Sequence, residues 1–358
     1  MTGARTPWWT WTWPLLACVV LLIAAFAGGG GIVAAAAGVV LLASVFAAVY
    51  HAEVVAHRVG EPFGTLVLAL AVTVIETALI VSVMLAAPAE KAGLARDTVF
   101  SAVMIVCNGI VGLCLLAGGA RHHEQGFHLQ GASAALAVLA ALTVLTLILP
   151  NYASPELGAR YNTPQLIFAG VVSLVLYGAF VFVQTVRHRE YFLPIQADDA
   201  EAHAPTPTRT ALVSGALLIV SLVVIVGLAK LLTPAVELGV AYLGVPTGVV
   251  GIVIAALVLL PEGLAALNAA QADRLQTSLN LALGSALATI GLTIPAVAVV
   301  SIAIGQPLEL GLGVKDQILL ALTLLLGVIT LGTGRTTILQ GIVHVVVFAV
   351  FLFLAAVP

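Results

Sequence analysis

Charged side chains are scarce in this chain of 358 residues. The 13 basic and 16 acidic residues make up 8% of the sequence, whereas 61% of it is hydrophobic, and an ordinary soluble domain is about 25% charged. So few charges cannot coat the surface of a soluble protein of this length. The net charge of −3 gives no basic patch for nucleic acid, and the high hydrophobicity disfavours a disordered or collagen-like chain.

Cysteine is also rare, and the sequence lacks the short motifs of common enzymes. Cys18, Cys107 and Cys114 all lie inside apolar runs, without the spacing of metal ligands, so we interpret them as packing residues rather than a disulfide scaffold. H-E-x-x-H, G-x-x-x-x-G-K-[ST] and G-x-S-x-G do not occur, which argues against a hydrolase or an ATP-driven pump. We therefore expect neither an enzyme nor a cofactor.

The sequence is rich in long hydrophobic runs, several of which exceed the roughly 20 residues that cross a bilayer as a helix. Eleven runs lie at about 8–28, 31–50, 64–87, 97–119, 131–150, 164–186, 210–232, 247–272, 277–303, 316–333 and 337–357. They predict an all-α integral membrane protein with about eleven transmembrane helices. Four tryptophans at the start of the first run fit an interfacial anchor, although a signal peptide is the alternative.

Only residues 187–209 are polar enough to form a soluble linker, which contains Asp198, Asp199 and Glu201. With a cytoplasmic N-terminus, eight basic residues fall inside, namely Arg5, Arg58, Arg121, Arg187, Arg189, Arg209, Arg274 and Arg335. Five fall outside, namely Lys91, Arg96, Arg160, Lys230 and Lys315. Cytoplasmic segments are enriched in basic residues. The excess of basic residues on the inner side therefore predicts a cytoplasmic N-terminus and linker and an external C-terminus.

An internal repeat is suggested by two G-x-P-x-G patterns, which begin at Gly60 and Gly244 and lie 184 residues apart. Each pattern opens a hydrophobic run that contains one glutamate, Glu76 in the first and Glu262 in the second. A structural accident would not be expected to recur at the matching place. We therefore treat the two glutamates as a pair.

The spans on either side of the linker divide into two groups of five. Residues 31–186 would form the first repeat and residues 210–358 the second, while residues 1–30 form a peripheral first helix. Since five is odd, the second repeat would enter the membrane from the opposite side. Inverted repeats of this kind are common in secondary transporters, whose sites lie near the middle of the membrane where the repeats meet.

Glu76 and Glu262 are the strongest candidates for a cation and proton site. An ionised glutamate in the middle of a span is costly unless it faces a cavity or a cation; the alternative is a protonated side chain bonded to Thr73 or Thr77. Pro261 precedes Glu262, and its missing N–H frees the carbonyl of Leu257. That carbonyl could join a site for a hard cation, since Ca²⁺ takes several oxygen ligands, or Pro261 is only a packing kink.

Polar residues recur in the spans that follow the two glutamates. Ser285, Thr289 and Thr293 repeat every four residues on one helical face, and Ser278 precedes Ser285 by seven. In the first half, Asn108 follows Ser101 by seven residues, while Asn280 lies on another face of its own helix. Hydroxyl groups often bond back to their own helix. Among these residues we favour Asn108 and Ser285 as part of the site.

Two further groups of polar residues are given ordinary structural interpretations. His122, His123 and Glu124 sit beside Arg121 in a short loop and are expected to form a solvated turn rather than a metal site. The acidic residues of the linker are likewise expected to be solvated rather than to sense cations. Gln340 and His344 lie four residues apart in the last span, where we expect both to hydrogen-bond to other helices.

These motif regions resemble the cation/proton exchanger family, and most closely its bacterial ChaA-type branch of calcium (and sodium or potassium)/proton antiporters. Gly60 to Thr65 with Val74-Ile75-Glu76 resembles the branch's first motif, and Pro261-Glu262-Gly263 with Leu283-Gly284-Ser285-Ala286 resembles the second. The G-N-A triplet that precedes the acid in the wider family is replaced by Val74-Ile75 and Leu260-Pro261. The resemblance covers roughly residues 31–357 and implies the eleven-helix inverted-repeat fold in a bacterial inner membrane.

We interpret the chain as a secondary antiporter that exchanges Ca²⁺ for protons by alternating access, with the lipid bilayer, inorganic cations and protons as its partners. Burial and mutual repulsion would raise the proton affinity of Glu76 and Glu262, so that a divalent cation competes with protons for them. The resemblance selects Ca²⁺, and exchange of Na⁺ or K⁺ for protons is the alternative. A cation channel and a membrane-embedded enzyme are less favoured.

Overall fold

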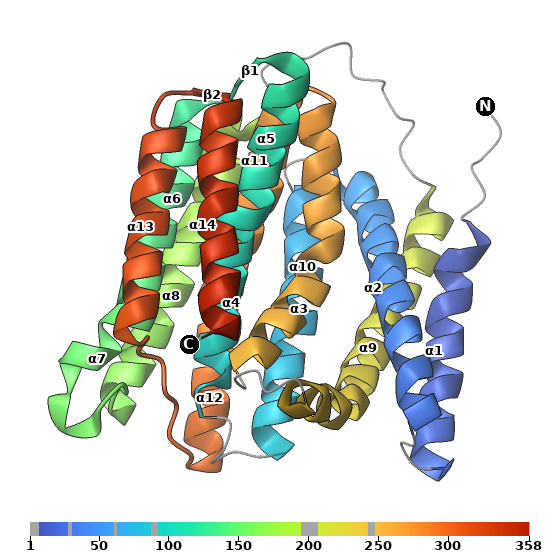
Figure 1. Ribbon diagram of the computed structural model, residues 1–358. Coiled ribbons are helices and arrows are strands. Elements are labelled where there is room, and N and C mark those ends of the chain that lie inside the picture. The colour runs from blue at the N-terminus through green and yellow to red at the C-terminus, as the bar shows by residue number, and fades with distance from the viewer. Residues whose placement is uncertain are drawn as a thin grey trace.

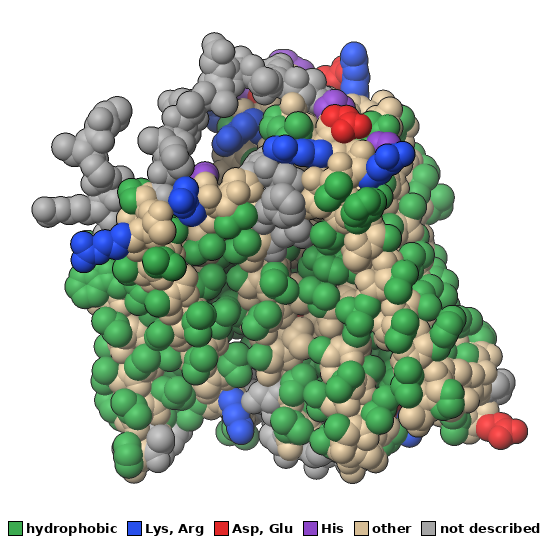
Figure 2. Space-filling model, turned by 180° about the vertical axis from the view of Figure 1, so that it is seen from behind, with side chains coloured by type: hydrophobic (Ala, Val, Ile, Leu, Met, Phe, Trp, Pro, Cys, Tyr) green, Lys and Arg blue, Asp and Glu red, His purple; other side chains and the backbone are tan. Residues whose placement is uncertain are grey.

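The computed structural model describes residues 7–27, 31–60, 63–86, 92–194, 207–242 and 248–357. Long helices lie side by side (Figure 1). Hydrophobic side chains cover the flank seen in Figure 2, and charged side chains gather toward its two ends. This distribution is the one expected of a protein that sits across a bilayer.

The first half of the chain forms α1 to α8 with one short strand. Its helices are α1 (Trp8–Ala27), α2 (Gly31–Val59), α3 (Phe63–Ala86), α4 (Leu94–Met104), α5 (Val111–His122), α6 (Leu129–Thr143), α7 (Pro150–Ala153) and α8 (Thr163–Phe182). The π-helical segment η1 (Ile105–Ile110) joins α4 to α5. Two further π-helical segments extend α6 and α8, namely η2 (Val144–Ile148) and η4 (Val183–Arg187). Two 3₁₀ segments follow α7 and η4, η3 (Pro155–Leu157) and η5 (Arg189–Phe192).

The second half repeats this helical character. Its helices are α9 (Thr208–Tyr242), α10 (Gly248–Gln271), α11 (Leu275–Ala288), α12 (Ile294–Ile304), α13 (Val314–Leu331) and α14 (Ile338–Ala356), with η6 (Thr289–Thr293) joining α11 to α12. The strands β1 (Glu124–Gly126) and β2 (Arg335–Thr337) pair in antiparallel fashion and connect the two halves. The turn predicted around His122 to Glu124 is therefore partly helix and partly strand.

Nine of the described helical stretches are long and apolar enough to cross a membrane. Shorter apolar stretches occupy Trp8–Ala24 in α1 and Ala69–Val81 in α3. The all-α membrane fold is thus confirmed, while the count of eleven spans and the inverted repeat stay predictions. In support of the repeat, η1 and η6 begin 184 residues apart, at Ile105 and Thr289, which is the spacing of the two G-x-P-x-G patterns.

The described helices pack into two hydrophobic clusters that meet at α3. The smaller cluster joins α2 to α1 and α9, and the larger one is built by α4 to α6 and α10 to α14 with parts of α8. Ile75 and Leu79 of α3 belong to the smaller cluster, whereas Ile80 and Met84 belong to the larger. Because α3 carries Glu76, this glutamate lies at the boundary between the two clusters.

Close packing in the larger cluster depends on small residues. In a lipid bilayer the hydrophobic effect does not drive helices together, so close van der Waals contact between backbones is needed. The backbone of α14 at Gly341 approaches α5 so closely that a Cβ atom there would lie 2.4 Å from the backbone nitrogen of Leu116. Gly112 of α5 faces His344 of α14 in the same way, at 2.9 Å from its Cβ. The two helices are therefore held in direct contact along one side.

Local sequence explains where several helices begin and end. Asn162 and Gln165 form a capping box at the start of α8, which satisfies backbone N–H groups that have no partner within the helix. Thr337 and Gln340 do the same for α14, so the prediction that Gln340 bonds to another helix was wrong. Gly60, with φ of +82°, ends α2 in a backbone conformation that glycine adopts without strain.

The molecule has two ends, which we name by what they carry. The linker face holds five arginines. Arg58, Arg121 and Arg187 lie at the ends of α2, α5 and η4. Arg274 lies between α10 and α11, and Arg335 begins β2. The opposite face holds the loops before α4, between α7 and α8, and between α12 and α13. Figure 1 shows α1 beginning near the linker face and α14 running from β2 toward the opposite face. Residues 195–206 of the predicted linker lie outside the described part of the chain.

Candidate functional site

Glu76 and Glu262 are both buried in the middle of their helices, with 1% and 4% of their surface exposed. Each accepts a hydrogen bond from a hydroxyl group of the helix that runs through α11 and η6. Ser285 Oγ donates to Glu262 Oε2, and Thr289 Oγ1 donates to Glu76 Oε2 at 2.6 Å. Since residues four apart on a helix lie about 6 Å from each other, the two carboxylates are neighbours.

Two residues of the polar stripe, Ser285 and Thr289, therefore face the two glutamates. The sequence favoured Ser285 for the site, but it did not favour Thr289. Thr293, one turn after Thr289, shares a hydrogen bond of 2.9 Å with Thr77 of α3. Thr73 instead donates to the carbonyl of Ala69 in its own helix. The alternative in which Glu76 bonds to Thr73 or Thr77 does not hold, because Thr289 of another helix donates to Glu76.

One oxygen of Glu76 has no partner within the described part of the chain. Glu76 Oε1 is buried and makes no hydrogen bond among the described residues. A buried carboxylate oxygen is costly when it has neither a donor nor a cation beside it. The described arrangement therefore leaves one oxygen of Glu76 able to accept a proton or to bind a cation.

Asn108 lies in η1, and its side chain bonds to residues other than the glutamates. Its Nδ2 donates to Thr323 Oγ1 of α13 at 2.8 Å, and its Oδ1 lies 3.1 Å from His344 Nδ1 of α14. The second ring nitrogen of His344 lies 3.1 Å from Thr330 Oγ1. The part of Asn108 in the cation site therefore stays a prediction, while the structure confirms that His344 bonds to other helices.

The seven-residue spacing from Ser101 to Asn108 identified a buried polar face but not the neighbour that this face meets. Ser101 Oγ donates to the carbonyl of Asp97 in its own helix at 2.6 Å. Asn280, on its separate face, donates to the carbonyl of Phe192 in η5 at 2.5 Å. In this structure the side-chain partners of the two glutamates come from the second half of the chain.

The helix α10 runs without interruption through Pro261. A proline lacks the N–H that would bond to the carbonyl four residues earlier, which is that of Leu257. Pro261 is buried and Leu257 is half-buried. The involvement of the Leu257 carbonyl in a cation site remains a prediction.

A cavity of about 320 Å³ opens at the linker face. It is lined by Glu53 and His57 of α2, by Arg274, by Ala265 of α10, and by Thr277 and Leu281 of α11. The sequence analysis missed Glu53 because the second hydrophobic run ends at residue 50, whereas α2 continues to Val59. A lone acid close to the end of an apolar run was the signal that could have revealed it.

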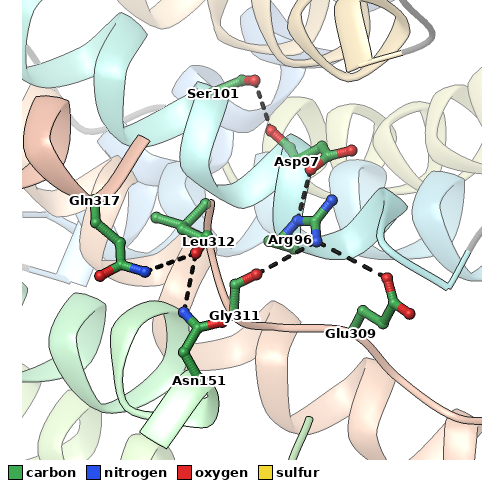
Figure 3. Close-up of polar contacts among 8 residues, drawn as sticks. All are labelled: Arg96, Asp97, Ser101, Asn151, Glu309, Gly311, Leu312 and Gln317. Carbon is green, nitrogen blue, oxygen red and sulfur yellow. Dashed lines mark hydrogen bonds and ion pairs between the residues drawn. The ribbon is translucent and has the colours of Figure 1, made fainter. Parts of the chain in front are cut away.

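Polar contacts join several loops at the opposite face (Figure 3). Arg96 Nε donates to Asp97 Oδ1 at 2.8 Å, and its Nη1 donates to the carbonyl of Gly311 at 3.3 Å and lies 3.9 Å from Glu309 Oε2. The carbonyl of Leu312 accepts hydrogen bonds from Asn151 and Gln317. These contacts tie the loop before α13 to the start of α4 and to α7.

A second set of contacts fixes the segment before α8 at the same face. Arg160 Nη2 forms an ion pair of 2.5 Å with Glu309 Oε1. Tyr161 donates from its hydroxyl to the carbonyl of Leu145 at 2.6 Å. Burial raises the pKa of Tyr161 to about 12, so this hydroxyl keeps its proton as a donor at any physiological pH.

A helical membrane protein with two adjacent buried carboxylates and a cavity that opens at one face has the architecture of a secondary transporter. The sodium/calcium exchanger protein family matches residues 29–186 and 213–357. The chain therefore belongs to this family, and it is an integral membrane antiporter of the cation/calcium exchanger superfamily.

Individual relatives agree with this assignment. The putative ionic transporter y4hA of Sinorhizobium fredii is 49% identical over 363 residues, which cover 99% of this chain and 98% of the relative. The sodium-potassium/proton antiporter ChaA of Escherichia coli is 35% identical over 87% of this chain and 85% of its own. The crystal structure of the Ca²⁺/H⁺ antiporter protein YfkE shares the fold, with a TM-score of 0.72 at 15% identity over 98% of both chains.

Proposed function

We propose that this antiporter exchanges Ca²⁺ for protons at Glu76 and Glu262 by alternating access. The observation that carries the proposal is the shared helix, because Ser285 and Thr289 hold one glutamate each. Two carboxylates and two hydroxyl groups offer six side-chain oxygens, and Ca²⁺ takes about six to eight. The carbonyl of Leu257 is the further ligand that we propose from the sequence.

Competition between cation and protons supplies the coupling. With no cation bound, two adjacent buried carboxylates cannot both stay ionised at low cost, so protons neutralise them. A divalent cation that reaches the site replaces up to two protons with little change in the charge of the site. Opening of the opposite face would require the contacts around Arg96 and Glu309 to separate.

Exchange of Na⁺ or K⁺ for protons is the second candidate, and it is favoured by the sequence identity to ChaA. The charge of the pair favours Ca²⁺, since one divalent ion balances two carboxylates. A monovalent ion would leave one carboxylate to be neutralised by a retained proton or by a second ion. The two candidates therefore differ in the number of protons moved per cation.

Flux measurements on the purified protein in liposomes test this proposal. A pH gradient is imposed, and Ca²⁺, Na⁺ and K⁺ are added in turn while the internal pH and cation content are followed. We expect each cation that is carried to move against protons in a fixed ratio. Currents with no fixed proton ratio would indicate a channel and would refute the antiport mechanism.

A further inference from the structure

The cavity at the linker face carries a carboxylate that the exchange mechanism has not used. Glu53 lies on α2 and lines the cavity together with His57, one helical turn further on, and Arg274, from the turn between α10 and α11. Glu53 is half-buried, so water can reach it from the cavity.

The helical register places the inner part of the cavity close to the paired glutamates. Ala265 follows Glu262 by three residues, and Leu281 precedes Ser285 by four. Residues three or four apart lie one above the other on a helix. The cavity therefore ends about one helical turn from the hydrogen bond between Ser285 and Glu262.

The chemistry of this cavity suits a proton better than a metal cation. A hard divalent cation needs about six oxygen ligands, and within the described part of the chain the side-chain oxygens that line the cavity are those of Glu53 and Thr277. The guanidinium group of Arg274 repels a partly dehydrated cation. A water molecule occupies about 30 Å³ in the liquid, so 320 Å³ leaves room for several waters that can carry a proton.

We propose that Glu53 is the proton acceptor that serves Glu262 through this cavity. The inference rests on the exchange function proposed above. The O–H bond of protonated Glu262 breaks, water in the cavity carries the proton, and a new O–H bond forms on the carboxylate of Glu53. Glu262 is left ionised for the cation, and Glu53 then releases the proton to the solution at the linker face.

The groups around Glu53 set the conditions for this transfer. Tyr50, three residues before it, and His57, four residues after it, flank it on α2. Arg274 lines the same cavity. At the same end, Arg58 donates to Thr208 Oγ1 at the start of α9 at 3.2 Å, and Arg209 follows on that helix. The ionised carboxylate of Glu53 is the form that accepts a proton.

The test separates proton transfer from cation binding in liposomes. Glu53→Gln and Glu53→Asp are compared with the wild type and with Glu190→Gln, a control whose carboxylate is exposed on the linker face. Ca²⁺-driven proton flux is measured over a range of pH, with Na⁺ in parallel. Exchange of isotopic Ca²⁺ against Ca²⁺ is measured at equal pH on both sides, because it needs no net proton release.

We expect Glu53→Gln to lower the proton-coupled rate by about tenfold or more, in the range of a lost proton-transfer group, and to leave isotopic exchange within about twofold of the wild type. Glu53→Asp should keep most of the coupled rate, and added imidazole buffer should restore part of it to Glu53→Gln. Unchanged coupled flux in Glu53→Gln would refute the relay, and so would an equal loss of both activities. Failure of the exchange function itself would show separately, as absent coupled flux in the wild type.

Discussion

Ser285 and Thr289 lie one helical turn apart and donate hydrogen bonds to different glutamates, Glu262 of α10 and Glu76 of α3. One helix of the second half thus holds both acids of the proposed site. The following predictions test whether these residues perform the exchange.

Glu76→Gln and Glu262→Gln should each abolish exchange of cations for protons while the protein remains folded and inserted. Glutamine keeps the size of the side chain and one carbonyl oxygen, but it neither releases a proton nor supplies a charge to a hard cation. Ca²⁺-driven proton flux at matched incorporation is the measurement. Glu156→Gln, at an exposed acid of the opposite face, is the control and should retain activity. Robust exchange by either buried variant would exclude the paired-carboxylate mechanism.

Thr289→Val should weaken the apparent affinity for the cation and leave the fold intact. The change removes the hydroxyl that donates to Glu76, so the ionised carboxylate loses a donor worth about 1.5–3 kcal/mol, or about tenfold to a hundredfold in affinity. Proton competition should increase, with the largest loss of cation affinity at low pH. Thr293→Val removes a hydroxyl that contacts Thr77 instead and serves as the matched control. Equal affinities in the two variants would show that the contact with Glu76 has no role in binding.

Asn108→Ala should destabilise the protein without a change in cation affinity. The substitution leaves Thr323 and His344 without their shared partner, and hydrogen bonds between membrane helices contribute about 1 kcal/mol each. Thermal unfolding in detergent should show the loss, and flux measurements should give an apparent affinity like that of the wild type. A large loss of affinity at unchanged stability would restore Asn108 to the site, as the sequence first suggested.

Pro261→Ala should weaken cation binding more than it affects folding. The restored N–H of residue 261 can bond to the carbonyl of Leu257 and withdraw it as a ligand. The apparent affinity and the unfolding temperature are compared with those of the wild type. If affinity does not change, the carbonyl is not a ligand and Pro261 serves only to shape the helix.

The linker face should be cytoplasmic and the end of α14 should meet the outside. A single cysteine placed at Glu190, which is exposed after η4, should react with a membrane-impermeant maleimide only after the cells are permeabilised. The native cysteines are removed first, and cysteine at Glu156 is the matched probe for the opposite face. Labelling of the Glu190 position from outside intact cells would reverse the predicted orientation.

The sequence was sufficient to predict the membrane fold and to select the two glutamates. Long hydrophobic runs, and one acid inside each of two related runs, can be recognised along the chain without knowledge of how the helices pack. It did not predict where α2 ends. Hydropathy falls at Tyr50 and His51, but no residue before Gly60 interrupts a helix, so α2 continues to Val59 and includes Glu53. Hydropathy measures the fit to lipid, whereas helix ends depend on backbone conformation.

The sequence also could not show which residues would be the hydrogen-bond partners of each polar helix face. The spacing of Ser285 and Thr289 defined a polar face, and that face does meet the glutamates. The spacing of Ser101 and Asn108 defined a face in the same way, yet Asn108 contacts Thr323 and His344. Periodicity tells which residues share a side of a helix, but only packing decides which neighbour that side meets.

The position of both hydroxyl groups on one helix has a consequence for the leakage of protons without exchange of a cation. If α11 and η6 rotate or slide as one body, Ser285 and Thr289 must leave their glutamates together. The two acids would then change from their protonated to their cation-bound state as a unit, and an intermediate with one proton lost and no cation gained would be rare. A transporter built in this way would waste little of the proton gradient through uncoupled slippage.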